Sequence, residues 1–233
     1  MPIFYHPDIT SGIVSLDAEE SRHCVKVLRL REGDSVSVAD GRGTLCRCRI
    51  VSADARECVV EAVETEEHYR QRPFRLHLAV APTKNMARIE WLVEKAVEIG
   101  VDEFTPVICQ HSERGVLKTD RLEKIAISAM KQSLRASLPV IHGATSLSDL
   151  LSSNLPQQRL VCYCEGNQRQ SLHQVYARGH DAVVLIGPEG DFAPSEIAHA
   201  MEAGFVPVTL GDTRLRTETA ALYALSALNF INE

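Results

Sequence analysis

The sequence predicts an α/β protein with a mostly parallel sheet covered by helices, preceded by a small β-domain. Two observations predict this fold. After residue 73, short apolar strands alternate with amphipathic helices, which is the pattern of a parallel sheet covered on both faces. Before residue 71, short alternating segments and turn signals predominate, as in a small barrel or sandwich. A chain of 233 residues is long enough for two such domains.

The first domain is expected over residues 1–70. Residues 35–39 alternate in polarity and end at the turn signal Asp40-Gly41, and residues 45–51 are the expected partner strand. Another strand is expected at 58–63 and a helix at 18–27. Residues 64–73 are polar and end in a proline, which is typical of a linker.

The second domain is expected over residues 74–233. Its first helix, 86–99, has an apolar stripe and ends before Gly100; the stripe, with Trp91 beside it, fits either a core or a dimer interface. The other expected helices span 120–133, 194–203 and 217–231. The expected strands span 74–81, 104–109, 160–164, 182–186 and 206–210.

Composition narrows the functional classes. Apolar residues make up 45% and charged residues 24%, which excludes a disordered or fibrous chain. No apolar run has the length of a membrane span and no signal-peptide pattern is visible, so we expect no membrane partner and a cytoplasmic location. The net charge of −6 does not by itself indicate nucleic-acid binding.

Cysteine and histidine spacing predicts no metal. The seven cysteines are an odd number without a CxxC pair, which favours reduced, mostly buried thiols over disulfides. The nine histidines form neither HxxxH nor HExxH.

Three of the expected strands end in residues suited to binding a ligand. They are followed by Cys164-Glu165-Gly166-Asn167, by Gly187-Pro188-Glu189-Gly190-Asp191-Phe192, and by a loop from Gly211 to Thr219 that contains two arginines. Ligands of α/β sheets bind beyond the carboxyl ends of strands, and glycines allow close approach to the backbone. Each loop alone also fits an ordinary turn. The absence of GxGxxG and of a P-loop disfavours a conventional dinucleotide or P-loop site.

The motif Gly187-Pro188-Glu189-Gly190, followed by Leu215-Arg216-Thr217-Glu218-Thr219-Ala220, resembles the ribosomal RNA small subunit methyltransferase E family within the SPOUT superfamily. Further matches lie at 27–30, 91–100, 112–114 and 131–133, so the resemblance spans nearly the whole chain. In two places the sequence departs from the family pattern, because Leu134 and Asp191 stand where glycine is frequent.

The resemblance implies a PUA-like RNA-binding barrel at 1–70 and a SPOUT domain with a C-terminal trefoil knot at 74–233. It implies a homodimer that binds S-adenosylmethionine and methylates N3 of one uridine in 16S rRNA, near the decoding centre of the assembled 30S subunit. The implied cofactor-binding residues are Cys164, Glu165, Ile186, Gly187, Pro188, Glu189, Gly190, Leu210, Gly211, Leu215, Arg216 and Thr217.

Chemistry suggests roles for two residues at the start of the last helix. The N3 position of uridine carries a proton, so catalysis has to remove it or stabilise the resulting anion. Arg216 is the first candidate for that stabilisation because a guanidinium stays charged and offers several donors. Glu218 is a candidate for positioning or proton acceptance, but it also fits a carboxylate that complements the helix dipole.

Two basic stretches are the candidate RNA contacts in this acidic chain. Residues 21–49 carry seven basic and three acidic side chains, and residues 111–135 carry six and three. The expected RNA-binding residues are Arg22, Arg29, Arg31, Arg114, Lys131 and Arg135. Two other functions remain open: a non-catalytic ribosome-assembly factor that binds RNA, and an enzyme acting on a small nucleotide.

Overall fold

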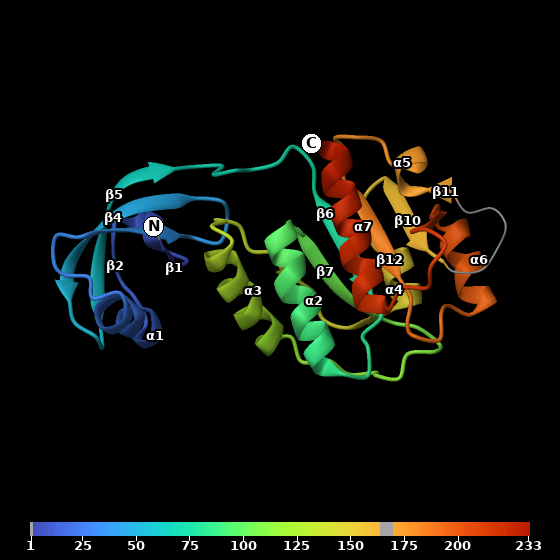
Figure 1. Ribbon diagram of the computed structural model, residues 1–233, viewed down its shortest axis with the longest axis horizontal. Helices are drawn as coiled ribbons and strands as arrows, with labels where there is room; N and C mark the ends of the chain where they lie inside the picture. The colour runs from blue at the N-terminus through green and yellow to red at the C-terminus, as the bar shows by residue number, and fades with distance from the viewer. Residues whose placement is uncertain (1, 164–169) are drawn as a thin grey trace. The chain divides into compact units, whose positions relative to one another are not determined.

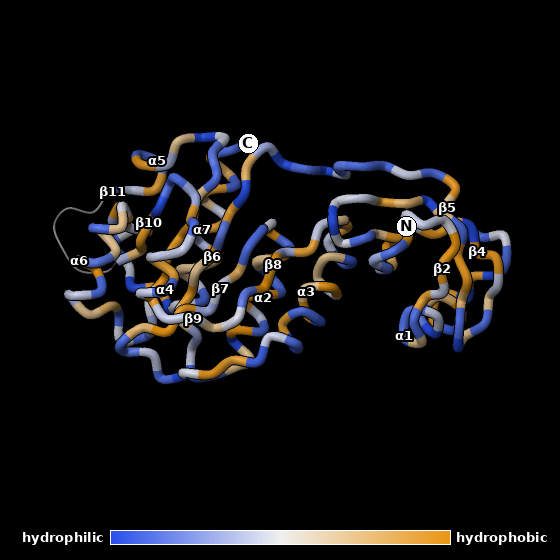
Figure 2. Tube along the Cα trace, turned by 180° about the vertical axis from the view of Figure 1, so that it is seen from behind, coloured by the Kyte–Doolittle hydropathy of each residue, from blue (hydrophilic) through white to orange (hydrophobic). Residues whose placement is uncertain are grey.

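The computed structural model describes residues 2–163 and 170–233 (Figure 1). The chain forms two compact units. The first comprises the residues up to Gln71 together with Ile127–Leu138, and the second comprises Arg72–Ala126 and Pro139–Glu233. The polar segment that follows β5 (Cys58–Glu66) is hydrophilic over most of its length (Figure 2).

The first unit is built on a five-stranded sheet with the order β1-β3-β4-β5-β2. The strands at 35–39, 45–51 and 58–63 are confirmed, and two of them extend further than the sequence predicted. Polarity along β4 alternates, with Cys46, Cys48 and Ile50 buried and Arg47 and Arg49 exposed. The pairs β1–β3 are parallel and the others antiparallel; the bounds are β1 Ile3–Tyr5, β2 Ile13–Ser15, β3 Ser35–Ala39, β4 Leu45–Ala53 and β5 Cys58–Glu66.

The helix expected at 18–27 consists of two parts. The α-helix α1 (Ala18–Arg22) begins where the Asp17 carboxylate accepts a hydrogen bond from the Glu20 amide, at 2.8 Å. The chain then widens into a π-helical turn, η2 (His23–Val27), in which the Leu28 amide bonds to the His23 carbonyl at 3.0 Å. A short 3₁₀ turn, η1 (Ile9–Ser11), completes the unit.

The second unit contains an eight-stranded sheet whose pairings are all parallel. Its order is β11-β13-β10-β12-β6-β7-β8, with β9 beside β7. All five strands expected here are confirmed, with ends shifted by one or two residues; the three remaining strands are only two residues long. The bounds are β6 Leu76–Val80, β7 Glu103–Ile108, β8 Val140–Ile141, β9 Thr145–Ser146, β10 Gln158–Cys162, β11 Gln170–Ser171, β12 Ala182–Ile186 and β13 Val206–Thr209.

Helices cover both faces of this sheet. On one face α2 (Met86–Ile99) packs against α7 (Thr217–Asn232), and the two run side by side in Figure 1. On the other face, α4 (Leu147–Ser152) and α6 (Pro194–Glu202) contribute to an apolar cluster with strand residues such as Ala79 and Val183. The expected α/β class is therefore confirmed, while the knot stays a prediction. The remaining helix is α5 (Leu172–Val175).

Thiols and helix lengths agree with the expectations from composition. The six described cysteines are free, five of them are buried, and Cys164 lies outside the described residues. Burial raises the pKa of Cys24, Cys48 and Cys109 to about 12, so these thiols are protonated at neutral pH. Within the described ranges, no helix has both the length and the apolar character needed to cross a bilayer.

The helix α3 (Asp120–Gln132) ends in a Schellman motif centred on Leu134. The Arg135 amide bonds to the Met130 carbonyl at 3.0 Å, and the Leu134 amide bonds to the Lys131 carbonyl at 3.3 Å. Leu134 has a φ of +56°, which lies in the left-handed region that favours glycine. This explains why glycine suits the position and why leucine is strained there.

Replacing Leu134 tests this strain. A left-handed residue with a Cβ costs about 1–2 kcal/mol, and the greater freedom of glycine in the unfolded chain offsets roughly half of that. We expect the free energy of unfolding of Leu134→Gly to be about 0.5–1 kcal/mol higher than that of Leu134→Ala. Urea denaturation measures both. The alanine variant is the matched control, because it loses the same side-chain packing but keeps the Cβ. Equal stability of the two variants would contradict the strain.

Candidate functional site

The carboxyl ends of three neighbouring strands form one cavity in the second unit. In the sheet, β10 lies between β12 and β13, and Cys162 is in register with both Ile186 and Val208. The carboxyl ends of these strands therefore lie at the same edge. The end of β10 and the loops after β12 and β13 line a cavity of about 690 Å³, and this lining includes the predicted residues Ile186, Gly187, Pro188, Glu189, Gly190, Leu210, Gly211, Leu215, Arg216 and Thr217.

The loop after β12 is shaped by two glycines. A Cβ on Gly187 would lie 2.8 Å from the ring of Phe192, which is closer than atoms approach without displacement. A Cβ on Gly190 would lie 3.2 Å from the Cβ of His111. Because both positions are crowded, the loop backbone itself forms the wall of the cavity.

Asp191 is the residue that departs from the family pattern in this loop. Its φ is +62°, so it adopts the left-handed conformation that glycine favours. Its carboxylate accepts a hydrogen bond from the Phe192 amide at 2.8 Å, and its carbonyl accepts one from His111 Nδ1 at 3.0 Å. Aspartate tolerates this conformation because its short side chain bonds to the local backbone.

The loop after β13 is fixed by short polar contacts. Gly211 has a φ of +116°, and the hydroxyl of Thr209 bonds to both its amide and its carbonyl, at 3.3 and 3.1 Å. Further along, the Arg214 guanidinium lies 3.5 Å from the Glu189 carbonyl of the neighbouring loop. The carboxylates of Glu189, Asp191 and Asp212 and the guanidiniums of Arg214 and Arg216 give the lining a mixed charge.

Thr217 joins the start of α7 to the loop after β12. It is buried, and its hydroxyl donates to the Gly187 carbonyl at 3.1 Å. This hydrogen bond connects residues that are 30 positions apart in sequence. It holds the amino terminus of α7, with its free amide groups, beside the cavity.

The two residues expected to act in catalysis lie in different environments. Arg216 is exposed, precedes the first residue of α7 and lines the cavity. Glu218 is buried and is not among the lining residues. One of its carboxylate oxygens lies 3.7 Å from Arg88 Nε on α2, and the other is buried without a hydrogen-bond partner among the described residues.

The structure leaves two predicted cofactor positions undescribed and adds other residues to the lining. Cys164 and Glu165 lie outside the described residues. The structure adds Tyr163, Asp191, Asp212 and Arg214 to the lining, although the sequence did not identify them as binding residues. The signal available in the sequence was proximity to a loop glycine, as for Asp191 beside Gly190 and Asp212 beside Gly211.

The basic residues expected to bind RNA differ in their contacts. In the first unit, Arg22, Arg29 and Arg31 are exposed, and Arg29 has a φ of +58°. Lys131 instead forms an ion pair with the buried Glu20, while Arg135 is half-buried. The burial of Glu20 raises the pKa of its carboxyl, although the hydrogen bond from Lys131 opposes that rise.

Arg114, in the second unit, is tied to the backbone. One guanidinium nitrogen donates to the Lys84 carbonyl at 2.8 Å, and Nε is buried without a hydrogen-bond partner. The side chain is therefore held in one place. A charge held in this way is better suited to contact a fixed ligand than a mobile charge on a solvated surface is.

Comparison with family models assigns both parts of the chain. A model described as an RNA methyltransferase domain matches residues 70–229, and one described as an RNA methyltransferase PUA domain matches residues 16–63. The first match alone covers more than half of the chain.

The names of individual relatives agree with these family models. The ribosomal RNA small subunit methyltransferase E of Aquifex aeolicus is 31% identical over 232 residues, which cover 98% of this chain and 99% of the relative. A crystal structure of a probable rRNA-methyltransferase from Porphyromonas gingivalis has 43% identity and a TM-score of 0.93, covering 100% of this chain and 98% of that one. A ribosomal RNA small subunit methyltransferase E from Neisseria gonorrhoeae, crystallised with S-adenosyl methionine, has 29% identity, a TM-score of 0.86 and coverage of 99% and 98%.

Removing the Thr217 hydroxyl tests the connection between α7 and the loop after β12. Thr217→Val keeps the shape but leaves a buried carbonyl without this donor, so we expect the free energy of unfolding to fall by about 1–3 kcal/mol. Thr217→Ser retains the hydroxyl and is the matched control. Guanidinium denaturation measures both variants, and a valine variant as stable as the serine variant would contradict the role of this hydrogen bond.

Proposed function

This chain belongs to the ribosomal RNA small subunit methyltransferase E family of S-adenosylmethionine-dependent rRNA methyltransferases, and we propose that it methylates N3 of one uridine in 16S rRNA. The proposed target lies near the decoding centre, and the proposed substrate is the assembled small subunit. The observation that carries the proposal is the cavity at the ends of β10, β12 and β13, with Arg216 at its wall.

The described lining fits S-adenosylmethionine. Ile186, Leu210 and Leu215 offer apolar surface for an adenine ring, and the crowded backbone at Gly187 and Gly190 offers peptide groups for polar edges. The carboxylates of the lining favour a cationic sulfonium. The cavity volume of about 690 Å³ is also within the range of cofactor sites.

S-adenosylmethionine supplies a methyl group on a positively charged sulfur, and the protein has to align the acceptor nitrogen with it. Loss of the N3 proton leaves an anion shared with the two carbonyl oxygens of the uracil. Arg216 is exposed at the cavity wall and has no hydrogen-bond partner among the described contacts, so its donors are available to those oxygens. A guanidinium stabilises such an anion through its permanent charge and its several donors.

We assign Glu218 a positioning role. Its burial and its ion pair with Arg88 place it between α7 and α2 instead of in the cavity lining. A carboxylate in the first turn of a helix also complements the helix dipole. Glu218 therefore fixes the helix start that carries Arg216, and the proton acceptor is a different group.

The proposal includes RNA contacts in both units and a homodimer in the cytoplasm. The exposed arginines of the first unit and the anchored Arg114 are the proposed phosphate contacts. Large apolar side chains are exposed on the paired helices α2 and α7, where Trp91 is 45%, Tyr223 53% and Phe230 77% accessible. Exposed aromatic groups on adjacent helices support a subunit interface there.

The central test replaces Arg216. We expect Arg216→Ala to lower the rate of methyl transfer at least about 100-fold, because one donor to a developing anion contributes this much. Binding of S-adenosylmethionine should persist. Tritium transfer to 30S particles measures turnover, and calorimetry measures cofactor affinity.

Arg216→Lys is the matched variant, since it keeps the charge but loses the fork of donors. We expect it to recover only part of the activity. Unchanged turnover in Arg216→Ala would remove this residue from the mechanism. A wild-type protein that binds 30S particles and S-adenosylmethionine without transferring the methyl group would instead favour the assembly-factor function.

If these arginines contact RNA phosphates, replacing one of them changes how steeply the affinity for 30S particles falls with salt. Each lost phosphate contact lowers the slope of log affinity against log salt by about 1. We expect this change for Arg29→Ala and for Arg114→Ala, and none for Arg56→Ala, an exposed arginine outside the predicted set. Filter binding to 30S particles over a salt series measures the slopes, and wild-type slopes in the first two variants would contradict the contacts.

A further inference from the structure

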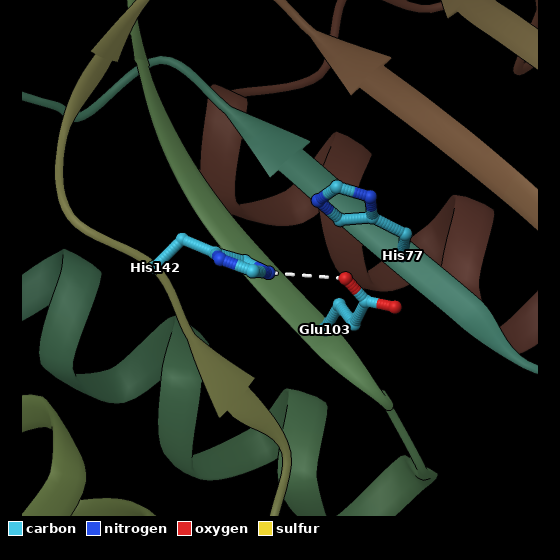
Figure 3. A group of neighbouring side chains, drawn as sticks. All are labelled: His77, Glu103 and His142. Atoms are coloured by element: carbon cyan, nitrogen blue, oxygen red, sulfur yellow. Dashed lines mark hydrogen bonds and ion pairs between the residues drawn. The ribbon is translucent and has the colours of Figure 1, made fainter. Parts of the chain in front are cut away.

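A second cluster of polar side chains lies at the other end of the sheet. His77 on β6 is in register with Glu103 on β7, so their side chains leave the same face of the sheet. His142 directly follows β8, and its amide bonds to the Phe104 carbonyl at 2.9 Å. Three strands that are distant in sequence thereby bring two imidazoles and one carboxylate together (Figure 3).

The distances within this cluster are short. One ligand atom from each of His77, Glu103 and His142 lies within 4.8 Å of the other two. The Nε2 atom of His142 is 3.0 Å from Glu103 Oε2, as the dashed line in Figure 3 shows. A tetrahedral zinc ion separates its ligand atoms by about 3.3 Å, so one pair already has this spacing and small side-chain rotations supply the rest.

The cluster is partly shielded from solvent. Only 7% of His77 is exposed, while Glu103 and His142 are half-buried. The attraction between a cation and its ligands is stronger at a partly buried site than at an exposed one.

The surroundings of the cluster also suit a metal. The hydroxyl of Thr105 lies 2.7 Å from His77 Nε2 and fixes the orientation of the ring. The nearby cation is Arg75, which is 3.3 Å from Glu103 Oε1. Its side chain is 59% exposed and can turn into solvent when another cation binds the carboxylate.

We propose that His77, Glu103 and His142 form a binding site for a divalent transition-metal ion, Zn²⁺ in the first place. Two imidazoles and a carboxylate are a common zinc ligand set, with the fourth position left to water. The sequence predicted no metal because its histidines lack the spacing of a local motif, whereas this site is assembled by strand pairing.

The site is structural and separate from the cavity. His77 pairs with Val183 on β12, three residues before Ile186 at the cavity, which is about 10 Å along the strand. β8 has only two residues and lies at the edge of the sheet. A metal that links His142 to β6 and β7 cross-links this short edge strand to the interior of the sheet.

The test is titration of the chelator-treated full-length protein with Zn²⁺ alone. We expect one ion per chain and a rise in Tm with Zn²⁺ concentration. His142→Gln should weaken the affinity at least tenfold, since even groups that only support a ligand have effects of this size. His173→Gln, at an exposed histidine on α5, is the matched control and should bind as the wild type does.

Cobalt distinguishes this site from the thiols of the chain. The Co²⁺-loaded wild-type protein should show ligand-field absorption without a thiolate charge-transfer band, and this measurement needs no variant. Absence of binding by the folded wild type, a thiolate spectrum, or unchanged affinity in His142→Gln would each overturn the proposal.

Discussion

The hydrogen bond between the Thr217 hydroxyl and the Gly187 carbonyl determines how the cavity at the ends of β10, β12 and β13 is assembled. The parallel order β13-β10-β12 brings three strand ends to one edge, but it does not fix where the following loops go. Thr217 fixes one of them, because a buried carbonyl without a donor is costly. With α7 held there, Arg216 is placed at the cavity wall, where its carbonyl accepts the hydrogen bond from the Ala220 amide that begins the helix.

The two departures from the family pattern have a common physical explanation. Leu134 and Asp191 both have positive φ, at +56° and +62°, so glycine is frequent at these positions because the backbone requires a left-handed residue. Their costs differ, since Asp191 bonds to the Phe192 amide whereas leucine has no polar group to do so. The charge of Asp191 is thus directed at its own loop and leaves the backbone of the cavity wall intact.

Sequence patterns predicted the features that are local and long. Most strands and helices that span at least four residues were predicted, as for α2, whose bounds agree residue for residue. The short helices α4 and α5 were missed. Strands of two residues, such as β8, carry no period and were missed. Side-chain partners were also inaccessible from the sequence: the ion pair between Lys131 and Glu20 spans 111 positions and depends on the fold.

The same limit applies to the two ends of the large sheet, which differ in how their chemistry is encoded. At the carboxyl ends, binding depends on loop backbone, so glycine-rich motifs mark it in the sequence. At the cluster of His77, Glu103 and His142, binding depends on which strands are neighbours, and single residues at 77, 103 and 142 have no motif. Because the β6–β7 register sets that cluster and the loops after β12 and β13 shape the cavity, a change at one end leaves the ligands of the other in place.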